Sequence, residues 1–395
     1  MKLLIISEKY YPEGSGAEFA TYLITKILSK YADVTLVSAP GAKPPENVRL
    51  ITVPLYRERM KGHIINSMMI TRLKSLIESH DIIYIPRTCY QFIPVAKKLN
   101  KKVIVHMHDY YGVTYNSILW MDEKLNKFSK DHIFYGRWIM GGLQNTILSV
   151  LPSLLNKFID RSLLKYADVI VCASYFHADI IKKLLGEYSG SIITIYNPLP
   201  EDILRVSLSF EDLRRKYEDK IFTYIGPPKV YKGFIHALAI LRALNVNARF
   251  IGVSDSSTLN LIKRKIPNAE VYPRLPHFSY LNKLKESYAV LLPFMCQESM
   301  SYTMIEAVIL GNLPIVRRIG VSIEFFGDSE LQKFLFQSNS EAIMNVKRSL
   351  HLNEKEYYYL IIKGVKVLKE KIKNEEIEKR WKMLLDYLLK DLTTQ

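Results

Sequence analysis

The sequence predicts an α/β protein made of two domains, each built around a doubly wound parallel sheet. Three observations support this prediction. The chain has 395 residues, 48% of them hydrophobic and 24% charged, which is enough for two domains with complete cores. Short continuous apolar runs alternate with patterns of helical periodicity, as in parallel βα units whose strands are covered on both faces. The same alternation begins again after a charged stretch with two prolines in the middle of the chain.

The first half shows this alternation from its first residues. The apolar run at residues 2–7 is too short for the core of a signal peptide and is followed by charge, so it is expected to be the first buried strand. The pattern that follows is typical of a Rossmann-like domain. It predicts further strands at 33–39, 81–86 and 101–109, and helices at 17–31 and 92–100.

The second half repeats the pattern, so a second Rossmann-like domain is expected. The boundary between the domains is placed in the stretch Pro198–Lys220, and the cleft between the domains is the expected ligand site. The pattern predicts strands at 220–226, 248–254, 269–275, 289–294 and 313–318, and helices at 236–245, 280–288 and Ser301–Leu310.

The tail has a long, charged helical pattern that runs from Tyr357 to Leu392 and breaks near Lys373 and Asn374. Trp381 and three leucines that follow it recur at helical spacing, so the tail is expected to pack on a domain.

Residues 110–165 interrupt the alternation with an aromatic and basic stretch that is longer than a usual connection, which indicates a functional elaboration. Apolar residues between 143 and 158 recur at helical spacing and predict a helix that packs on its own domain. A helix within 133–160 that lies on a membrane surface is the alternative.

The composition and the net charge limit the classes of protein to which the chain could belong. The net charge of +16 is spread over both halves, and it would attract phosphate-rich partners without choosing among nucleotides, anionic lipid and nucleic acid. Solubility explains the charge equally well. No apolar run reaches the ~18 residues of a membrane-spanning helix, so a soluble or peripheral protein is expected. A reducing compartment is expected because no spacing suggests a disulfide or a metal site among Cys89, Cys172 and Cys296.

The stretch "FMCQESMSYTMIEAVILGNLPIV" carries the strongest chemical signal. Pro293 ends the preceding strand, so Glu298 is expected on a loop, and Ser301 or Thr303 is expected to cap a helix that carries Glu306 and stops at Gly311. A helix that opens at the carboxyl end of a parallel strand can hold a phosphate with its free amides. A carboxylate beside that phosphate would accept hydrogen bonds from the hydroxyl groups of a sugar or a ribose.

Three further features could face a ligand. Gly16 stands in a glycine-rich turn after the first strand, and Lys229 and Lys232 stand in a similar loop that opens the second half. His106 and His108 lie on one face of an expected strand. The pair could suggest a metal site, but no further histidine or spaced aspartate follows, so a substrate-facing His108 is favoured.

Taken in order, these features resemble the retaining glycosyltransferases of family four, which have the GT-B architecture of two Rossmann-like domains facing a cleft. The resemblance spans nearly the whole chain. Its most specific part is the family's E-x7-E signature, seen here as Glu298 and Glu306 and followed by Ala307, Gly311 and Pro314. Because the family's closing helix crosses back to the first domain, the resemblance implies domains of 1–200 plus 376–395, and 201–375.

The resemblance also implies roles for single residues. Glu298 would contact the hydroxyl groups of the donor sugar, and Glu306 would hold the ribose. The diphosphate would bind at Ser301, Tyr302 and Thr303, with Gly16 approaching it from the first domain and Lys232 compensating the charge of the leaving group. His108 would lie near the transferred sugar. The family has an arginine where Pro227 stands, and Lys229 is the candidate substitute.

Together with the residues, the resemblance implies a retaining, metal-independent glycosyltransferase that needs no cofactor. It would move a sugar from a nucleotide-sugar donor to a glycan or lipid-linked acceptor, in the cytoplasm or at the inner face of the membrane, with peripheral membrane contact as an open alternative and no nucleic-acid partner. Two other functions stay open. One is a nucleotide-sugar epimerase or hydrolase on the same fold, and the other is a non-catalytic binder of anionic lipid or nucleic acid.

Overall fold

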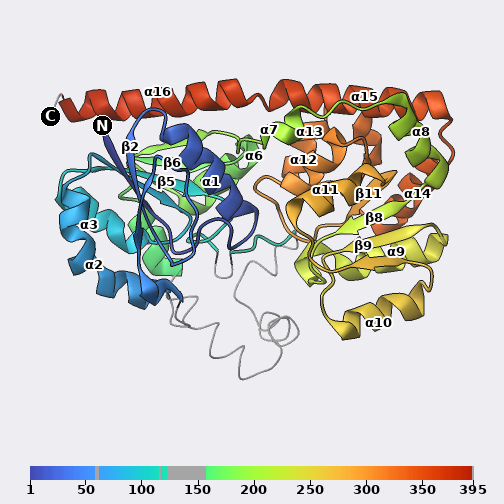
Figure 1. Ribbon diagram of the computed structural model, residues 1–395, viewed down its shortest axis with the longest axis horizontal. Helices are drawn as coiled ribbons and strands as arrows, with labels where there is room; N and C mark the ends of the chain where they lie inside the picture. The colour runs from blue at the N-terminus through green and yellow to red at the C-terminus, as the bar shows by residue number, and fades with distance from the viewer. Residues whose placement is uncertain (58–61, 115–116, 122–156, 394–395) are drawn as a thin grey trace. The chain divides into compact units, whose positions relative to one another are not determined.

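The structure is a computed structural model that describes residues 1–57, 62–114, 117–121 and 157–393. The described residues divide into two compact units, which are coloured blue to green and green to red in Figure 1 apart from the red C-terminal helix of the first. The first unit holds the described residues up to Leu119, those from 157 to Leu199 and those from Ile372 onward. The second unit holds Trp120, Met121 and the residues from Pro200 to Lys371.

The first unit is built on a parallel sheet that has seven strands within the described residues. Its strand order is β3-β2-β1-β4-β5-β6-β7, so the chain winds outward from β1 in one direction and then returns to continue from β4 in the other. This makes the sheet doubly wound, with its switch point between β1 and β4. The strands are β1 (Lys2–Ile6), β2 (Asp33–Ser38), β3 (Arg49–Thr52), β4 (Ile82–Pro86), β5 (Lys102–Met107), β6 (Val169–Cys172) and β7 (Ser191–Thr194).

The second unit repeats this plan with six described strands in the order β10-β9-β8-β11-β12-β13, and its switch point lies between β8 and β11. All pairs in both sheets are parallel. The predicted fold class of two doubly wound, parallel-sheet domains is therefore confirmed, while the predicted cleft between them stays a prediction. The strands are β8 (Phe222–Ile225), β9 (Ala248–Ile251), β10 (Glu270–Tyr272), β11 (Ala289–Leu292), β12 (Leu313–Arg317) and β13 (Leu335–Phe336).

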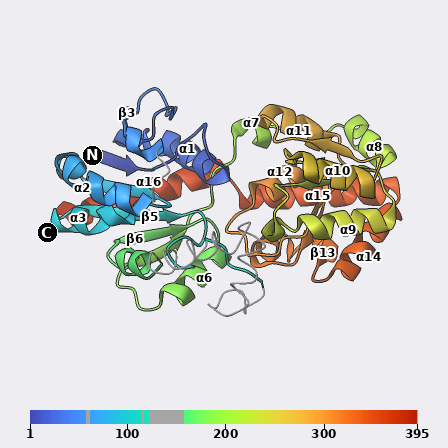
Figure 2. The same ribbon diagram turned by 90° about the horizontal axis from the view of Figure 1, so that it is seen from below.

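Helices lie on both sides of each sheet, as Figures 1 and 2 show from two directions. Strands such as β4, β5, β11 and β12 are therefore buried along their whole length, which explains why they are continuous apolar runs in the sequence. The helices of the first unit are α1 (Gly16–Leu28), α2 (Gly62–Glu78), α3 (Ile93–Lys98), α6 (Tyr175–Leu185) and α16 (Asn374–Thr393), with 3-10 turns η1 (Pro54–Arg57) and η2 (Tyr90–Phe92). Those of the second unit are α7 (Glu201–Leu204), α8 (Phe210–Asp219), α9 (Phe234–Leu244), α10 (Ser256–Lys265), α11 (His277–Lys285), α12 (Tyr302–Ile309), α13 (Gly320–Phe326), α14 (Asn339–Leu350) and α15 (Glu354–Lys371), with 3-10 turns η4 (Val230–Lys232) and η5 (Glu330–Phe334).

The tail forms the two helices α15 and α16, with the break that the sequence predicts near Lys373. Asn374 begins α16 and binds both backbone groups of Leu199, since its side chain donates to the Leu199 carbonyl at 2.7 Å and accepts from the Leu199 amide at 3.0 Å. Further along α16, the fully buried ring of Trp381 lies edge-on to Tyr84 of β4 at 5.7 Å. The last helix is thus part of the first unit's core.

One sequence prediction concerns residues that the structure describes only in part. The helix expected between 143 and 158 lies outside the described residues except at its end, where residues 157–164 are helical.

No helix in the described part of the chain is both long and apolar enough to cross a membrane. The three cysteines are buried, and none of them forms a disulfide.

Candidate functional site

Two loops of the second unit meet where the strand order of its sheet reverses. One follows β8 and leads through η4 into α9, and the other follows β11 and leads into α12. Because β8 and β11 are parallel neighbours, their carboxyl ends lie side by side. This is the position at which doubly wound sheets bind their ligands.

Gly233 allows the two loops to touch. Its φ angle is +73°, in the left-handed region, and a Cβ placed on it would overlap the carbonyl oxygen of Pro293 on the other loop. Only glycine accommodates both the backbone conformation and the close approach. The contact brings Lys232, the residue before Gly233, close to the loop that carries Glu298.

Lys232 and Glu298 form an ion pair, with Nζ and Oε1 2.8 Å apart and side chains 26% and 15% exposed. Burial alone would lower the pKa of Lys232, but the charge of Glu298 outweighs it and raises this pKa. The ammonium also lies 5.4 Å from the ring centre of Phe294, a favourable cation–π distance. Lys232 is therefore a cation at neutral pH whose partner in this structure is a carboxylate.

The helix α12 begins directly beyond Glu298. Ser301 is its N-cap, and its hydroxyl accepts a hydrogen bond from the amide of Met304. Tyr302 and Thr303 form the start of the helix, where backbone amides point along the axis toward the strand ends. Gly311, with φ of +82°, ends it. The predicted loop position of Glu298 and the predicted helix with its cap and stop are thus confirmed as structure.

Glu306 lies one turn into α12 and is only 4% exposed. The ring of His277, the first residue of α11, donates to it, with Nε2 and Oε1 3.1 Å apart. This hydrogen bond raises the pKa of His277, while burial opposes the shift. The structure therefore adds a histidine to the two glutamates that the sequence singled out.

The far end of α12 is held by a buried lysine. Lys216 of α8 is 2% exposed, and its Nζ donates to the carbonyl oxygen of Leu310 at 2.5 Å. A cation at this position also interacts favourably with the C-terminal end of the helix dipole. Burial nevertheless lowers the pKa of Lys216 to about 7.

We expect Lys216→Met to flatten the pH dependence of stability. The folded-state pKa of about 7 lies below the ordinary lysine value, so the unfolded chain binds one more proton between about pH 7 and 10. The free energy of unfolding of the wild type should therefore rise with pH in this window, by up to about 1.4 kcal/mol per unit. Denaturant unfolding at pH 7 and pH 9 measures the change. Parallel pH dependences of wild type and variant would contradict the buried, titrating ammonium.

The first unit has a pocket of its own at the corresponding place in its sheet. The pocket has a volume of about 210 Å³ and lies at the carboxyl ends of β1, β4 and β5, beside the first turns of α1. It is therefore at the switch point of this sheet as well. Its walls are formed by Ser7, Glu8, Lys9, Ala17, Glu18, Thr21, Pro86, Arg87, Thr88, His108, Tyr111 and Ser117.

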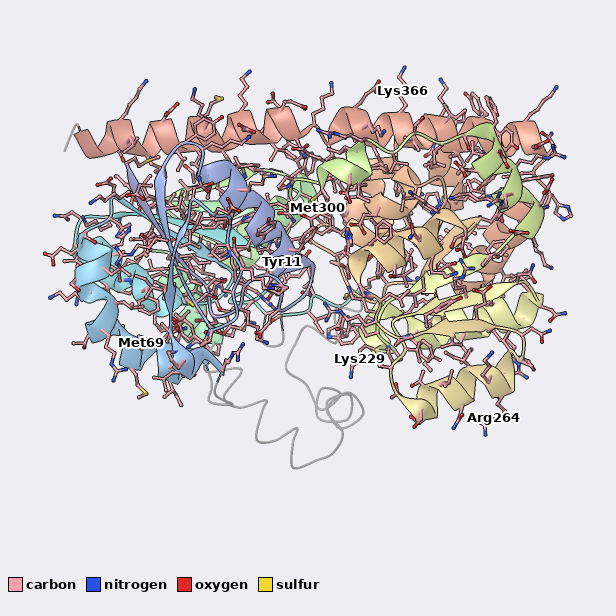
Figure 3. All side chains as sticks on the ribbon, viewed as in Figure 1. Tyr11, Met69, Lys229, Arg264, Met300 and Lys366 are labelled. Atoms are coloured by element: carbon pink, nitrogen blue, oxygen red, sulfur yellow. The ribbon has the colours of Figure 1, made fainter. Side chains whose placement is uncertain are left out.

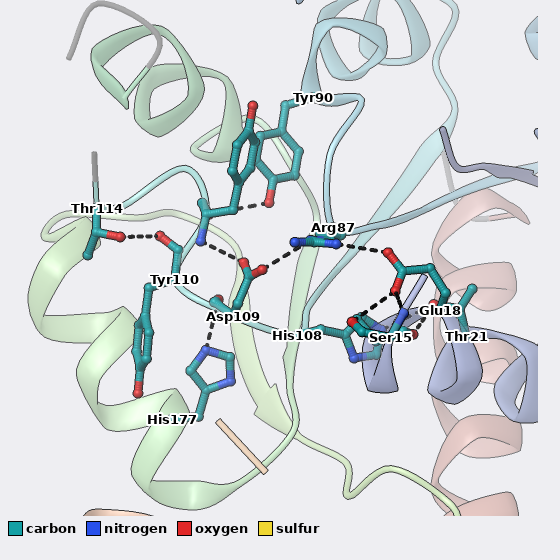
Figure 4. A network of polar contacts seen from close by, with 12 residues as sticks. Ser15, Glu18, Thr21, Arg87, Tyr90, His108, Asp109, Tyr110, Thr114 and His177 are labelled. Carbon is teal, nitrogen blue, oxygen red and sulfur yellow. Dashed lines mark hydrogen bonds and ion pairs between the residues drawn. The ribbon is translucent and has the colours of Figure 1, made fainter. Parts of the chain in front are cut away.

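Arg87 joins two carboxylates across this pocket, as Figure 4 shows. Its Nη1 donates to Glu18 of α1 at 2.8 Å, and its Nε donates to Asp109 after β5 at 3.0 Å. The other oxygen of Glu18 accepts from the amide and the hydroxyl of Ser15 at the cap of α1. The network thus fixes three loops, those after β1, β4 and β5, to one another.

The charges in this network depend on one another. Burial raises the pKa of Asp109, against the opposing charge of Arg87. Burial would also raise the pKa of Glu18, but the hydrogen bond from Ser15 and the charge of Arg87 prevail and lower it. The charge of Asp109 in turn raises the pKa of Arg87. Arg87 also has a φ of +96°, an unfavourable value for a residue with a side chain, and strain of this kind concentrates at functional sites.

His108 lies in the pocket next to this network and is neutral at physiological pH. Burial lowers its pKa to about 3, and the charge of Arg87 acts in the same direction. Its Nε2 lies 3.3 Å from the hydroxyl of Thr21, which itself donates to the carbonyl oxygen of Ala17 at 2.9 Å. Since a hydroxyl has one proton, Nε2 must be the donor to Thr21, which assigns the ring proton to Nε2.

His106 lies on the same side as His108, with ring centres 4.0 Å apart, as the alternation along the strand predicts. It faces the core, where its Nδ1 lies 2.9 Å from the hydroxyl of Tyr84. His177 of α6 instead holds the turn after β5, because its Nε2 donates to the carbonyl oxygen of Asp109 at 3.2 Å. Within the described residues, no group of three or more side chains is arranged to hold a metal ion.

The remaining predicted site residues lie on exposed parts of the two units. Gly16 is the exposed first residue of α1. Lys229 is exposed on the loop after β8, at the place that Figure 3 labels, and its amide donates to the carbonyl oxygen of Pro227 at 2.7 Å. Lys232 is the lysine of this loop that meets Glu298, a distinction that the spacing of the two lysines did not predict.

The sequence pattern does not mark three titratable residues that the structure places at these two sites. Arg87 and Asp109 are single charged residues that follow β4 and β5, and His277 opens a helix from a different βα unit than Glu306. The one available signal was their position directly after a strand or at the start of a helix, where ligand-binding residues gather in α/β sheets.

No protein-family model and no curated protein matches the sequence. Solved structures match it over nearly its whole length. Sucrose-phosphate synthase from Thermosynechococcus elongatus has a TM-score of 0.73 at 12% identity, with 99% of each chain covered. HepE from Anabaena in complex with UDP and glucose has a TM-score of 0.68 at 13% identity, with 98% of this chain and 100% of that chain covered.

A third match is α,α-trehalose 6-phosphate synthase from Burkholderia multivorans, with a TM-score of 0.67 at 12% identity and coverage of 100% of this chain and 99% of that chain. The three proteins are glycosyltransferases of GT-B architecture. At these identities the likeness concerns the fold, and it confirms the predicted GT-B fold class.

Proposed function

We propose that this chain is a retaining, metal-independent glycosyltransferase that moves a sugar from a nucleotide-sugar donor to an acceptor. The observation that carries the proposal is the meeting of Lys232, Glu298 and the start of α12 at the switch point of the second sheet. The fold shared with HepE, whose structures contain UDP and UDP-glucose, supports a uridine nucleotide as the first donor to test.

In this proposal the second unit binds the donor. The amides at Ser301, Tyr302 and Thr303 receive the diphosphate, as the first turn of a helix favours. Glu306 receives the ribose hydroxyls. Glu298 gives up its contact with Lys232 and binds hydroxyl groups of the sugar, while Lys232 turns to the phosphate. Lys229 takes the role of the arginine that the resembled family has at the position of Pro227.

Cleavage of the bond between the sugar and the phosphate leaves negative charge on the nucleoside diphosphate. A fixed cation and fixed backbone amides stabilise such charge as it develops, because they need no reorganisation during the reaction. Lys232 and the start of α12 supply both, so the proposal requires no metal ion. The new bond forms on the face of the sugar from which the diphosphate departs, and the acceptor hydroxyl gives its proton to the departing phosphate.

The first unit supplies the acceptor side. Its pocket is lined mainly by polar side chains, and neutral His108 can exchange hydrogen bonds with a sugar without adding charge. Gly16, at the exposed start of α1, is proposed to approach the diphosphate. A glycan or lipid-linked acceptor agrees with this polar lining.

A peripheral contact with the inner face of the membrane is part of the proposal for a lipid-linked acceptor. The exposed apolar side chains of Phe158 and Ile159 in the described part of the segment 133–160 favour it. Flotation with liposomes that contain anionic lipid tests it, and an intact chain that stays in the soluble fraction would remove this part of the proposal.

The decisive test of the function is a panel of nucleotide sugars and acceptors, assayed with the wild type and with Glu298→Ala and Glu306→Ala. Transfer by the wild type and its loss in both variants is the expected result. Conversion of a donor without an acceptor would indicate an epimerase or a hydrolase instead. Turnover that is the same in all three proteins would refute the assignment of the site.

A further inference from the structure

The contact between His277 and Glu306 carries a second inference, which rests on the proposed function. Glu306 is only 4% exposed by residue area, and a buried carboxylate is stable only when its oxygens are hydrogen-bonded. His277 meets this need from α11, with Nε2 3.1 Å from Oε1, yet 41% of its own side chain is exposed. His277 is thus a partly exposed side chain that contacts the buried carboxylate directly.

The surroundings of the pair favour a fixed carboxylate. Tyr280 lies one turn after His277 on α11, with its ring centre 5.9 Å from that of the histidine. Burial and then the charge of Glu306 raise the pKa of Tyr280, so its hydroxyl stays protonated beside the carboxylate. Asp202 of α7 is a further negative group that acts on His277, and it raises the pKa of the histidine together with Glu306. Tyr302 of α12 is likewise kept protonated beside Glu306.

We propose that His277 is a positioning residue for the recognition of ribose. By donating to Oε1, it holds the Glu306 carboxylate in one orientation, and the remaining acceptor sites of this carboxylate receive the ribose hydroxyls of a nucleoside diphosphate. The lone pairs of a carboxylate are numerous enough for both tasks, because its two oxygens offer about four acceptor sites. A carboxylate that can rotate would lose rotational freedom when the ligand binds, and this cost would reduce its preference for a hydroxyl.

The preference for UDP over 2′-deoxy-UDP measures this role. Both nucleotides have the same phosphates and base, so changes elsewhere in the site cancel in the ratio of their dissociation constants. We expect the wild type to prefer UDP about tenfold, since an unpaired buried polar group costs about 1–3 kcal/mol. His277→Ala should reduce the preference at least threefold, and His277→Gln should keep most of it because an amide can also donate to the carboxylate.

Two further variants complete the experiment. Glu306→Gln gives the ratio of the two dissociation constants in the absence of the carboxylate. Adding His277→Ala to this variant should change the ratio no further, because the two residues act through one contact. His236→Ala is the matched control. His236 is a partly buried histidine of the same unit that binds Asn339 at 3.0 Å, and its loss should leave the ratio unchanged.

The outcomes separate this inference from the proposed function. If the wild type binds neither nucleotide, both the uridine-donor proposal and this inference are overturned. If it binds UDP with a preference that His277→Ala does not reduce, or that the glutamine variant loses as fully as the alanine variant, only the role of His277 is overturned. A ligand-free measurement adds to this: the pKa of His277 should fall in Glu306→Gln, and an unchanged pKa would show that the contact is absent in solution.

Discussion

Replacing Glu298 by glutamine is expected to slow sugar transfer strongly while it strengthens the binding of the nucleoside diphosphate. The ion pair with Glu298 at 2.8 Å occupies Lys232, so a diphosphate must compete with this carboxylate for the ammonium. Removal of the negative charge frees Lys232 and should tighten UDP binding roughly fivefold, about 1 kcal/mol for one partly buried charge contact. Transfer should fall about 10²- to 10³-fold, because the variant lacks the carboxylate that orients the sugar in the transition state.

Initial rates and calorimetric titration with UDP measure the two effects in one preparation. Lys232→Met is the counterpart variant, because it removes the cation and should weaken UDP binding as well as transfer. Weaker UDP binding by Glu298→Gln, or transfer at the rate of the wild type, would show that the carboxylate neither competes for Lys232 nor contacts the sugar.

Replacing Arg87 by methionine is expected to destabilise the first unit by about 2–4 kcal/mol at neutral pH. The change leaves Glu18 and Asp109, which are 5% and 25% exposed, without the cation that joins them. Uncompensated buried charges of this kind cost about 3–5 kcal/mol. The expected destabilisation is set lower, at about 2–4 kcal/mol, because the Arg87 side chain is 35% exposed. Denaturant unfolding of the intact chain measures the change.

The loss should shrink as the pH falls from 7 toward 4. In the wild type, the lowered pKa of Glu18 gives stability that is present above the unfolded-state pKa and is lost on acidification. In the variant, burial without Arg87 raises the pKa of both carboxyl groups, so the folded state takes up protons early and the penalty disappears. Both effects reduce the difference in the free energy of unfolding between the wild type and Arg87→Met.

Arg57→Met is the matched control for Arg87→Met. Arg57 also pairs with a glutamate, Glu13, but the two side chains are 53% and 50% exposed. A pair this exposed contributes about 0–1 kcal/mol, so its loss should change stability little at any pH. Equal losses of stability in the two variants would show that the Arg87 network stabilises the chain no more than an exposed ion pair does.

The βα units could be predicted because strands covered on both faces are continuous apolar runs. All six residues of β5 and all five of β4 are buried, and both were visible in the sequence. The edge strands β3 and β13 lack such runs, since β3 is partly exposed throughout and β13 has two residues. Short edge strands form by pairing with a neighbour, so their own sequence indicates them weakly.

The loop and helix around Glu298 and Glu306 could be predicted because each boundary has a local chemical signal. Pro293 follows the last residue of β11, Ser301 caps α12, and Gly311 ends it. These signals act within a few residues of chain, which is the range that sequence reasoning covers well.

Partners that come from distant parts of the chain could not be predicted. Arg87 meets Glu18 across 69 residues of sequence, and Lys232 meets Glu298 across 66. These contacts depend on which strands become neighbours in the sheet, and on details such as the approach of Gly233 to Pro293. Charged residues at strand ends are common, and only the assembled sheet distinguishes those that meet.

The proposed site for a nucleoside diphosphate lies in the second unit, where the loops after β8 and β11 meet. Hydrogen exchange of the intact chain with and without UDP tests it most directly. We expect slower exchange at residues 226–233 and 297–306 and at the start of α11, with the first unit's sheet unchanged. Unaltered exchange in these segments at saturating UDP, or protection confined to other parts of the chain, would contradict it.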